Sequence, residues 1–189
     1  ALAATSKAST LALEPLRFDH SVLPWLPFIS DTSELLASVR RKLCTMLDCW
    51  LPSKDNNDAI MALLAPWIEL LRGKEQHKLA TKVAERLNSM LEAEFSFSAQ
   101  RQVVWPFKVL LKWHQIIPYR IWLLPVKRHV LQGFLDYLRL WLEDPDANYA
   151  EIADWYWQWK QMYPTAIFAS SDIQNAFREA LVYMAFALS

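Results

Sequence analysis

The four histidines are the first side chains to consider for metal or acid-base chemistry, and their spacing supports neither. They lie in separate segments, at His20, His77, His114 and His129. None has a second ligand-type residue at the i+3 or i+4 spacing that brings two ligands to one face of a helix. We therefore expect each histidine to have a structural or surface role, and we expect no metal and no cofactor.

The two cysteines do not form a recognisable redox or metal motif. Cys44 and Cys49 are five residues apart within a stretch that has helical periodicity. This is neither a CxxC pair nor a zinc spacing, and a helix places the two side chains on different faces. We expect small, buried or half-buried thiols in a reducing compartment.

Nucleotide-binding and nucleophile motifs need glycines that this sequence does not have. Its only glycines are Gly73 and Gly133, too few for a P-loop, a dinucleotide-binding fingerprint or a nucleophile elbow. Neighbouring acids such as Glu92 and Glu94 are typical of a solvated face. We assign no general acid, base or nucleophile and predict a non-enzymatic domain. A divergent enzyme, with a site assembled from distant residues, is the alternative.

A basic stretch is the first feature that suggests binding. Residues 95–135 contain no Asp or Glu, and aromatic residues alternate with the basic ones. Two interpretations stay open: the cations contact RNA phosphates or an acidic partner, or they pair across neighbouring helices while the aromatics form core. The net charge of zero favours pairing, because nucleic-acid modules are usually basic overall. The candidate contact residues are Arg101, Lys108, Lys112, Arg120, Lys127 and Arg128.

The second such feature is a run of aromatic residues at 155–160. On a helix Trp155 and Trp159 share one face, whereas Trp157 points elsewhere. Either a second element covers Trp157 or this side chain is an exposed anchor for a partner. Tryptophan is enriched among the residues that dominate binding energy at protein interfaces.

Helices must position these residues. The chain has 189 residues, 53% of them hydrophobic, with ten Trp and two Gly. Sheet folds use glycine freely in hairpins and bulges, so its scarcity favours an all-α fold. We predict an irregular array of about seven antiparallel helices without a sheet, in residues 23–189, after a Pro/Ala/Ser-rich segment over 1–22. No apolar run approaches the length of about 20 residues that a membrane span needs.

Several helix ends have sequence signals. Asp31-Thr32-Ser33-Glu34 predicts a capping box, Pro66 the start of a helix, and Gly73 its C-cap. Another helix is predicted over 125–142, and one beginning near Asp146 or Asn148. The inward residues expected for the last helix are Ile173, Phe177, Leu181 and Met184.

The aromatic run belongs to a longer pattern that resembles a known family. Its most specific part is Asn148-Tyr149-Ala150-Glu151-Ile152, followed by Trp155-Tyr156, Trp159-Lys160 and Met162. Weaker matches, in the same order, are Pro24-Trp25-Leu26-Pro27, Arg41-Lys42-Leu43, Trp50 with Pro52-Ser53, Pro66-Trp67, Trp141-Leu142, and Phe177 with Glu179-Ala180-Leu181 and Met184. Together they resemble the C-terminal region of the tuftelin-interacting or septin-interacting protein family, which is part of a broader GC-rich-sequence-binding-factor-like group. The resemblance covers almost all of 23–189 and is least over 72–104.

The resemblance implies a nuclear role in pre-mRNA splicing. Members of the family pair a glycine-rich G-patch with this helical region, and the G-patch recruits and activates a DEAH-box RNA helicase that dismantles the intron-lariat spliceosome. With two glycines, this chain has no G-patch, so any link to the helicase is indirect. What remains implied is docking onto late-spliceosome proteins or onto a related GC-rich-factor-like protein, without a membrane.

For this docking we expect contacts from Trp157, Lys160 and Tyr149. An RNA-binding domain and a transcription-linked GC-rich-factor-like paralogue are the alternatives. Because the chain opens without Met, we also expect it to be part of a longer protein.

Overall fold

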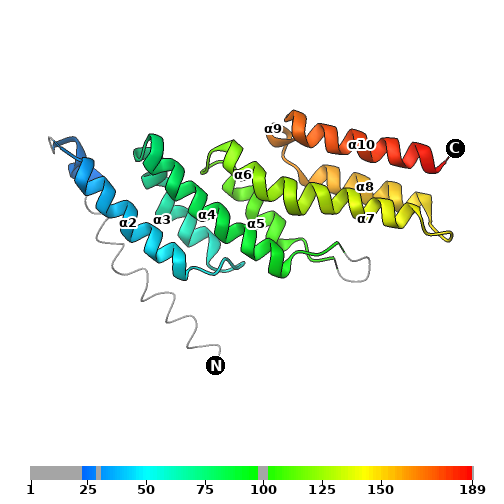
Figure 1. Cartoon of the computed structure of the whole chain (residues 1–189), viewed down its shortest axis with the longest axis horizontal. Helices are drawn as coiled ribbons and strands as arrows, with labels where there is room; N and C mark the ends of the chain where they lie inside the picture. Colours follow the sequence, from blue (N-terminus) through cyan, green and yellow to red (C-terminus); the bar gives the residue numbers. More distant parts are fainter. Residues whose placement is uncertain (1–22, 29–30, 98–101, 189) are drawn as a thin grey trace, which may run out of the picture.

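The chain forms an elongated row of helices, as predicted for an all-α fold. A computed structural model describes residues 23–28, 31–97 and 102–188. Within these ranges there is no sheet, and one isolated antiparallel bridge joins Ser96 and Val103. Figure 1 shows the helices side by side from α2 at one end to α10 at the other.

The first half of the row is built around α4. Besides α3, this helix contacts α2, α5 and α6. The elements of this half are η1 (Leu23–Phe28), α2 (Ser33–Cys49), α3 (Asn57–Leu70), α4 (Gly73–Glu94) and α5 (Trp105–Trp113).

The second half is built around α7, which contacts both α8 and α10. The elements of this half are α6 (Tyr119–Pro125), η2 (Val126–Leu131), α7 (Gln132–Leu142), α8 (Tyr149–Met162), α9 (Thr165–Phe168) and α10 (Ser171–Ala187).

One apolar stripe on each helix faces the core. In α2, the buried residues Val39, Leu43 and Leu47 repeat every four residues and therefore lie on one face. The neighbouring helix α4 also bonds the end of α2, because Arg86 Nε donates to the Leu47 carbonyl oxygen at 2.7 Å. This bond satisfies one of the carbonyls that a helix leaves without a partner in its last turn.

The start of α2 differs from the predicted capping box. Asp31 Oδ1 accepts hydrogen bonds from Ser33 N at 2.9 Å and from Ser33 Oγ at 2.7 Å. Thr32, the N-cap residue, makes no side-chain bond to the helix. A local Asp31–Ser33 turn therefore begins this helix.

Two proline and glycine predictions for the first half were wrong. Pro66 lies inside α3 and does not start a new helix. Pro66 leaves the carbonyl of Ala62 without its helical donor, and Ala62 is an exposed residue. Gly73 has a φ of 59° and opens α4, whereas α3 already ends at Leu70.

The helix predicted over 125–142 begins earlier and is irregular. It starts at Tyr119, contains Pro125, and adopts π geometry over Val126–Leu131, where Gln132 N donates to the Lys127 carbonyl. Proline cannot donate to the preceding turn and its ring crowds it. The wider π turn lets the chain pass Pro125 and continue directly into α7.

The last helix buries only part of its predicted stripe. Ile173 and Phe177 are buried, whereas Leu181 is 48% exposed. The residues that the structure describes therefore cover only about half of Leu181, in the second half of α10.

Candidate protein-docking surface

The residue at which α8 begins is defined by its N-cap, and this helix carries Trp157. Asn148 is its N-cap, and Asn148 Oδ1 accepts a hydrogen bond from Ala150 N at 3.1 Å. The helix begins at Tyr149, which confirms the predicted start near Asp146 or Asn148.

An aromatic core fixes how α8 is rotated. The Trp155 ring stacks on Phe134 with centroids 5.0 Å apart and planes 12° apart. Trp159 is 1% exposed. The centroid of its ring lies 4.8 Å from that of Phe97 and 5.7 Å from that of Phe107. Because Trp155 and Trp159 both point into this core, Trp157 must point away from it.

Trp157 lies on the outer side of α8 and is 51% exposed. Of the two interpretations of the aromatic run, an exposed side chain is the one observed. Lys160 Nζ lies 4.7 Å from the centroid of the Trp157 ring and 5.5 Å from that of Phe168 in α9. The lysine thus bridges α8 and α9 by cation–π contacts and holds the indole in place.

Tyr149, the third predicted contact residue, lies apart from this pair. It precedes Trp157 by two turns of helix, which is about 12 Å along the axis. Tyr149 Oη donates to the carbonyl oxygen of Ala187, at the end of α10, at 3.3 Å. The structure brings Trp157 and Lys160 together and places Tyr149 at a different edge.

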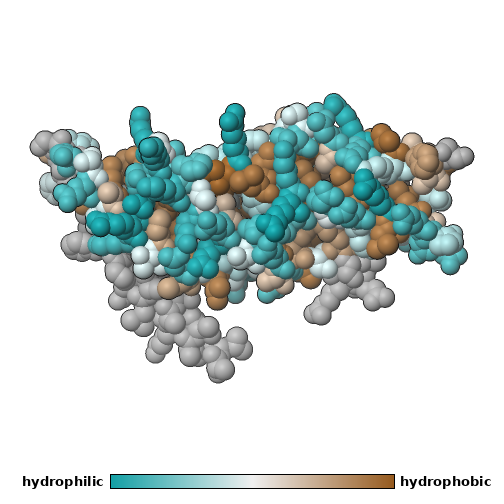
Figure 2. Space-filling view, viewed as in Figure 1, coloured by the Kyte–Doolittle hydropathy of each residue, from teal (hydrophilic) through white to brown (hydrophobic). Residues whose placement is uncertain are grey.

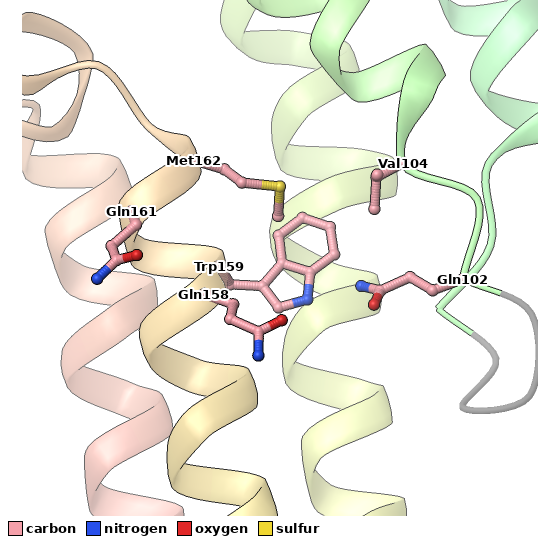
Figure 3. Close-up of a pocket in the computed structure, with 6 residues that line it drawn as sticks. All are labelled: Gln102, Val104, Gln158, Trp159, Gln161 and Met162. Carbon is pink, nitrogen blue, oxygen red and sulfur yellow. The ribbon is translucent and has the colours of Figure 1, made fainter.

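A small pocket lies beside this surface, between α8 and the segment before α5. Its volume is about 300 Å³, and its lining contains no charged side chain. Figure 3 shows the Trp159 indole as its inner wall, with the ring nitrogen on the side of Gln102. This nitrogen is buried and has no acceptor among the described residues. The lining residues are Gln102, Val104, Gln158, Trp159, Gln161 and Met162.

The sequence did not reveal this pocket. Gln102 and Val104 precede α5, and the remaining lining residues follow more than fifty positions later in α8, so only the tertiary fold joins them. The lining offers amide hydrogen bonds and apolar contact but no acid or base. It is therefore suited to binding an uncharged group and not to proton transfer.

The basic stretch is largely paired within the molecule. Of its candidate residues, Arg101 lies outside the described residues. Lys112 Nζ lies 2.7 Å from Asp58 Oδ1, and Lys127 Nζ lies 2.5 Å from Asp172 Oδ1. These contacts favour internal pairing, with one acid from α3 and one from α10.

The remaining basic residues differ in their contacts. Arg128 Nη2 lies 3.7 Å from Glu92 Oε1. Lys108 and Arg120 are exposed. The five candidate residues that the structure describes therefore do not form one unpaired cluster.

The aromatic residues of the basic stretch are mostly core. Phe107, Trp113 and Trp122 are buried, Trp105 is half-buried, and Tyr119 is partly exposed. Buried rings are not available for stacking on bases, which RNA-binding surfaces use.

The perturbed ionisable groups have structural explanations. Hydrogen bonds from Lys112 and Asn57 lower the pKa of Asp58. Burial lowers the pKa of His129 and raises that of Tyr163. Among the described residues, no three His, Cys, Asp or Glu side chains gather as metal ligands.

Two further observations concern the cysteines and the membrane. Both thiols are free; Cys44 is half-buried, but Cys49 is exposed, so the expectation of two buried or half-buried thiols was wrong for Cys49. No helix in the described part of the chain has the length and apolar character needed to cross a membrane.

The sequence is similar to proteins of one family along most of its length. The profile of the family described as GC-rich sequence DNA-binding factor-like protein matches residues 5–138. Tuftelin-interacting protein 11 is 30% identical in Rattus norvegicus and 29% in Xenopus laevis, each over 173 residues, which are 90% of this chain and 20% of the relative. The septin and tuftelin-interacting protein 1 homolog of Dictyostelium discoideum is 22% identical over 215 residues, covering 93% of this chain and 24% of the relative. The chain therefore spans about a fifth to a quarter of the length of these relatives.

Proposed function

Because the chain belongs to the GC-rich sequence DNA-binding factor-like family, we propose that it is a non-catalytic docking domain of a splicing factor. It acts in the nucleus at the late, intron-lariat stage of pre-mRNA splicing, when the spliceosome is dismantled. The splicing role is what the motifs of α8 imply through their family resemblance. The names of the relatives, which refer to tuftelin-interacting and septin-interacting proteins, are consistent with binding to other proteins.

One observation carries the docking role: Trp157 is half exposed while the aromatic residues on the other side of α8 are buried. An exposed indole normally adds no stability to a fold, and tryptophan is enriched where partners bind. Lys160 holds the ring in one orientation, which lowers the entropy that a partner has to overcome. Gln158 and Gln161 line the uncharged pocket on the same helix, and they extend this surface toward the pocket.

The partners that we propose are late-spliceosome proteins or a related GC-rich-factor-like protein. A DEAH-box helicase is reached only indirectly, through a G-patch that this chain does not contain. Tyr149 is a peripheral contact residue in this proposal, because it lies at another edge of α8.

Crosslinking in nuclear extract tests the proposal. Tagged protein is crosslinked through its lysines, and mass spectrometry maps the partners that Lys160 and Lys108 contact. We expect late-spliceosome proteins, and we expect Trp157→Ala to remove them. Trp25→Ala is the matched control, because Trp25 is also exposed and belongs to η1, the element at the opposite end of the row. Crosslinks confined to the domain itself would contradict the docking role.

Direct RNA binding and a transcription-linked role are weaker candidates. The RNA hypothesis has two exposed cations in its favour, Lys108 and Arg120. Against it are the ion pairs of Lys112, Lys127 and Arg128 and the net charge of zero. The same net charge argues against the DNA binding to which the family's description refers.

A further inference from the structure

The indole nitrogen of Trp159 is a buried donor that lacks an acceptor. Trp159 is 1% exposed, and its Nε1 has no hydrogen-bond partner among the residues that the structure describes. The ring itself packs against Phe97 and Phe107. A buried N–H that has lost its bond to water and gained no other is costly and uncommon. This atom therefore marks a position where an acceptor is needed.

The donor belongs to the wall of the pocket between α8 and the segment before α5. Figure 3 shows the ring nitrogen on the side of Gln102. Gln102 is exposed and precedes α5, so no helix holds its side chain in place, and it can move to admit a group beside the indole. The pocket volume of about 300 Å³ is many times the share of one water molecule, about 30 Å³. It lies at the lower limit for ligand sites, about 300–1,000 Å³, and so suits a single side chain.

The lining of the pocket defines the chemistry of its ligand. Val104 and Met162 supply apolar surface, and the amides of three glutamines both donate and accept hydrogen bonds. A charged group would lose its hydration here without meeting an opposite charge, because the lining contains none. A neutral group on an apolar stem, with an acceptor and a donor on the same edge, fits these walls. A primary carboxamide is such a group.

We propose that this pocket binds the carboxamide side chain, Asn or Gln, of a partner protein. The carbonyl oxygen of that side chain accepts from Trp159 Nε1, and its amide nitrogen donates to Gln102 Oε1. Its methylene groups pack on Val104 and Met162. The inference rests on the proposed docking role of α8, because the partner that covers Trp157 continues onto the same helix toward the pocket.

Other occupants satisfy the pocket less well. A backbone peptide unit is trans, so its N–H and C=O point in opposite directions and cannot pair with Gln102 and Trp159 together. A nucleobase is neutral, but RNA brings phosphates, and the pocket lining has no cation to neutralise them.

Hydrophobic surface alone does not select a partner on this molecule. On the face that Figure 2 shows, hydrophobic side chains lie in several areas between hydrophilic ones. Each of these areas would accept many apolar partners. The buried N–H of Trp159 is more selective, because it requires an acceptor at one position.

A titration of the 189-residue chain, followed by the indole N–H signals in ¹H–¹⁵N spectra, tests the proposal. The probes are N-acetyl-glutamine N-methylamide and its asparagine counterpart. The signal of Trp159 is assigned by its loss in Trp159→Phe. We expect this signal to shift and saturate with at least one of the two probes. The glutamate and leucine counterparts should bind at least severalfold more weakly, since one adds a charge and the other lacks the amide.

Gln102→Leu tests the second hydrogen bond. Leucine has a similar size but no acceptor, so the carboxamide probe should bind about two- to tenfold more weakly. Gln115→Leu is the matched control, because Gln115 is also exposed and does not line the pocket. Gln102 is exposed, so this comparison remains possible if Trp159→Phe unfolds the chain.

Three results would overturn the proposal. An unchanged Trp159 signal with both carboxamide probes would mean that the pocket holds only water. An equal shift with the glutamate or leucine probe would show that the amide is not recognised. A shift with uridine and not with the carboxamides would assign the pocket to a nucleobase.

These results are distinct from a failure of the docking role. The titration measures a site on this chain without any partner protein, whereas crosslinking identifies the proteins that bind α8. Partners that are lost in Trp157→Ala, together with a silent titration, would support docking and reject the pocket. Bound carboxamide with no crosslinked partner would reject docking and leave a side-chain site.

Discussion

Lys160 Nζ lies over the Trp157 ring, 4.7 Å from its centroid, while the tryptophan remains 51% exposed. The contact joins a half-exposed tryptophan to a half-buried lysine of the same helix. At an exposed site a cation–π contact contributes about 0.5–1 kcal/mol. Its main effect is therefore to hold the ring in one orientation.

Trp157→Ala should separate binding from stability. We expect a loss of less than about 1 kcal/mol in the free energy of unfolding, because the contacts that Trp157 makes with Lys160 and, in a T-shaped arrangement, with Tyr156 lie at an exposed site. Partner recovery in the crosslinking experiment should fall strongly. Trp25→Ala should lower partner recovery less than Trp157→Ala does, and it should also lower the free energy of unfolding less. A Trp157→Ala variant that keeps all its partners would show that this ring is not an anchor.

Trp159→Ala and Phe177→Ala should be severely destabilising. Both side chains are at most 3% exposed and belong to the aromatic core. Truncating a buried aromatic side chain costs about 3–5 kcal/mol, because it leaves a cavity as well as removing contacts. Urea denaturation measures the change, with Trp157→Ala as the comparison two residues away. Unchanged midpoints would mean that these rings are not packed as the structure has them.

Helical periodicity was sufficient to predict much of the fold. The scarcity of glycine predicted an all-α chain, and helical spacing predicted the shared face of Trp155 and Trp159 in α8. The direction of Trp157 also followed from helical geometry, because Trp155 and Trp159 occupy the opposite face. These are local properties, so a sequence pattern contains them.

Features that depend on tertiary neighbours were not predictable in this way. Leu181 continues the apolar stripe of α10, yet in the described part of the chain it is 48% exposed, and periodicity cannot tell a covered stripe from an uncovered one. Pro66 is typical of a helix start, but it lies inside α3, one turn after the exposed residue Ala62. The partners of Lys112 and Lys127 are distant in sequence, so the net charge indicated pairing without identifying the acids.

His129 should make stability depend on pH. Burial lowers its pKa below the ordinary value of 6.5, so in the window between the two values the unfolded chain binds more protons. The free energy of unfolding should therefore fall as pH decreases from 6.5, and this loss is complete below the folded pKa. Glu92 opposes the shift and Arg128 adds to it, but burial is the largest cause.

His129→Gln tests whether His129 causes this dependence of the free energy of unfolding on pH. The glutamine amide can replace the hydrogen bond that joins His129 Nε2 to Asn88 Oδ1 at 2.8 Å, but it does not titrate. Melting temperatures measured between pH 7 and 5 should change less in this variant than in the wild type. An identical slope in both proteins would assign the pH dependence to other groups.

RNA binding should be weak and only slightly sensitive to salt. Each phosphate that a protein neutralises adds to the slope of affinity against salt concentration, and three candidate cations already have acidic partners. Filter binding with single-stranded RNA across a salt series measures this slope. A steep slope would instead support a nucleic-acid interface, provided that Lys108→Ala reduces it and the control Lys74→Ala, on α4, does not.

A buried hydrogen bond between Asn57 and Trp113 should stabilise the junction of α3 and α5. Asn57 is 1% exposed, and its Oδ1 accepts from Trp113 Nε1 at 2.7 Å. Asn57→Ala leaves the buried indole N–H without an acceptor, which costs about 1–3 kcal/mol. Asn175→Ala, on the exposed side of α10, should change the free energy of unfolding by less than about 0.5 kcal/mol.

A double-mutant cycle with Trp113→Phe isolates the bond from other effects. Phenylalanine removes the donor, so adding Asn57→Ala in that background should cost less than it does in the wild type. We expect a coupling of at least about 0.5 kcal/mol, since residues that share a buried hydrogen bond do not contribute additively. Additive losses would show that Asn57 stabilises α3 through its other contacts, the bonds from its Nδ2 to Asp58 and Met61.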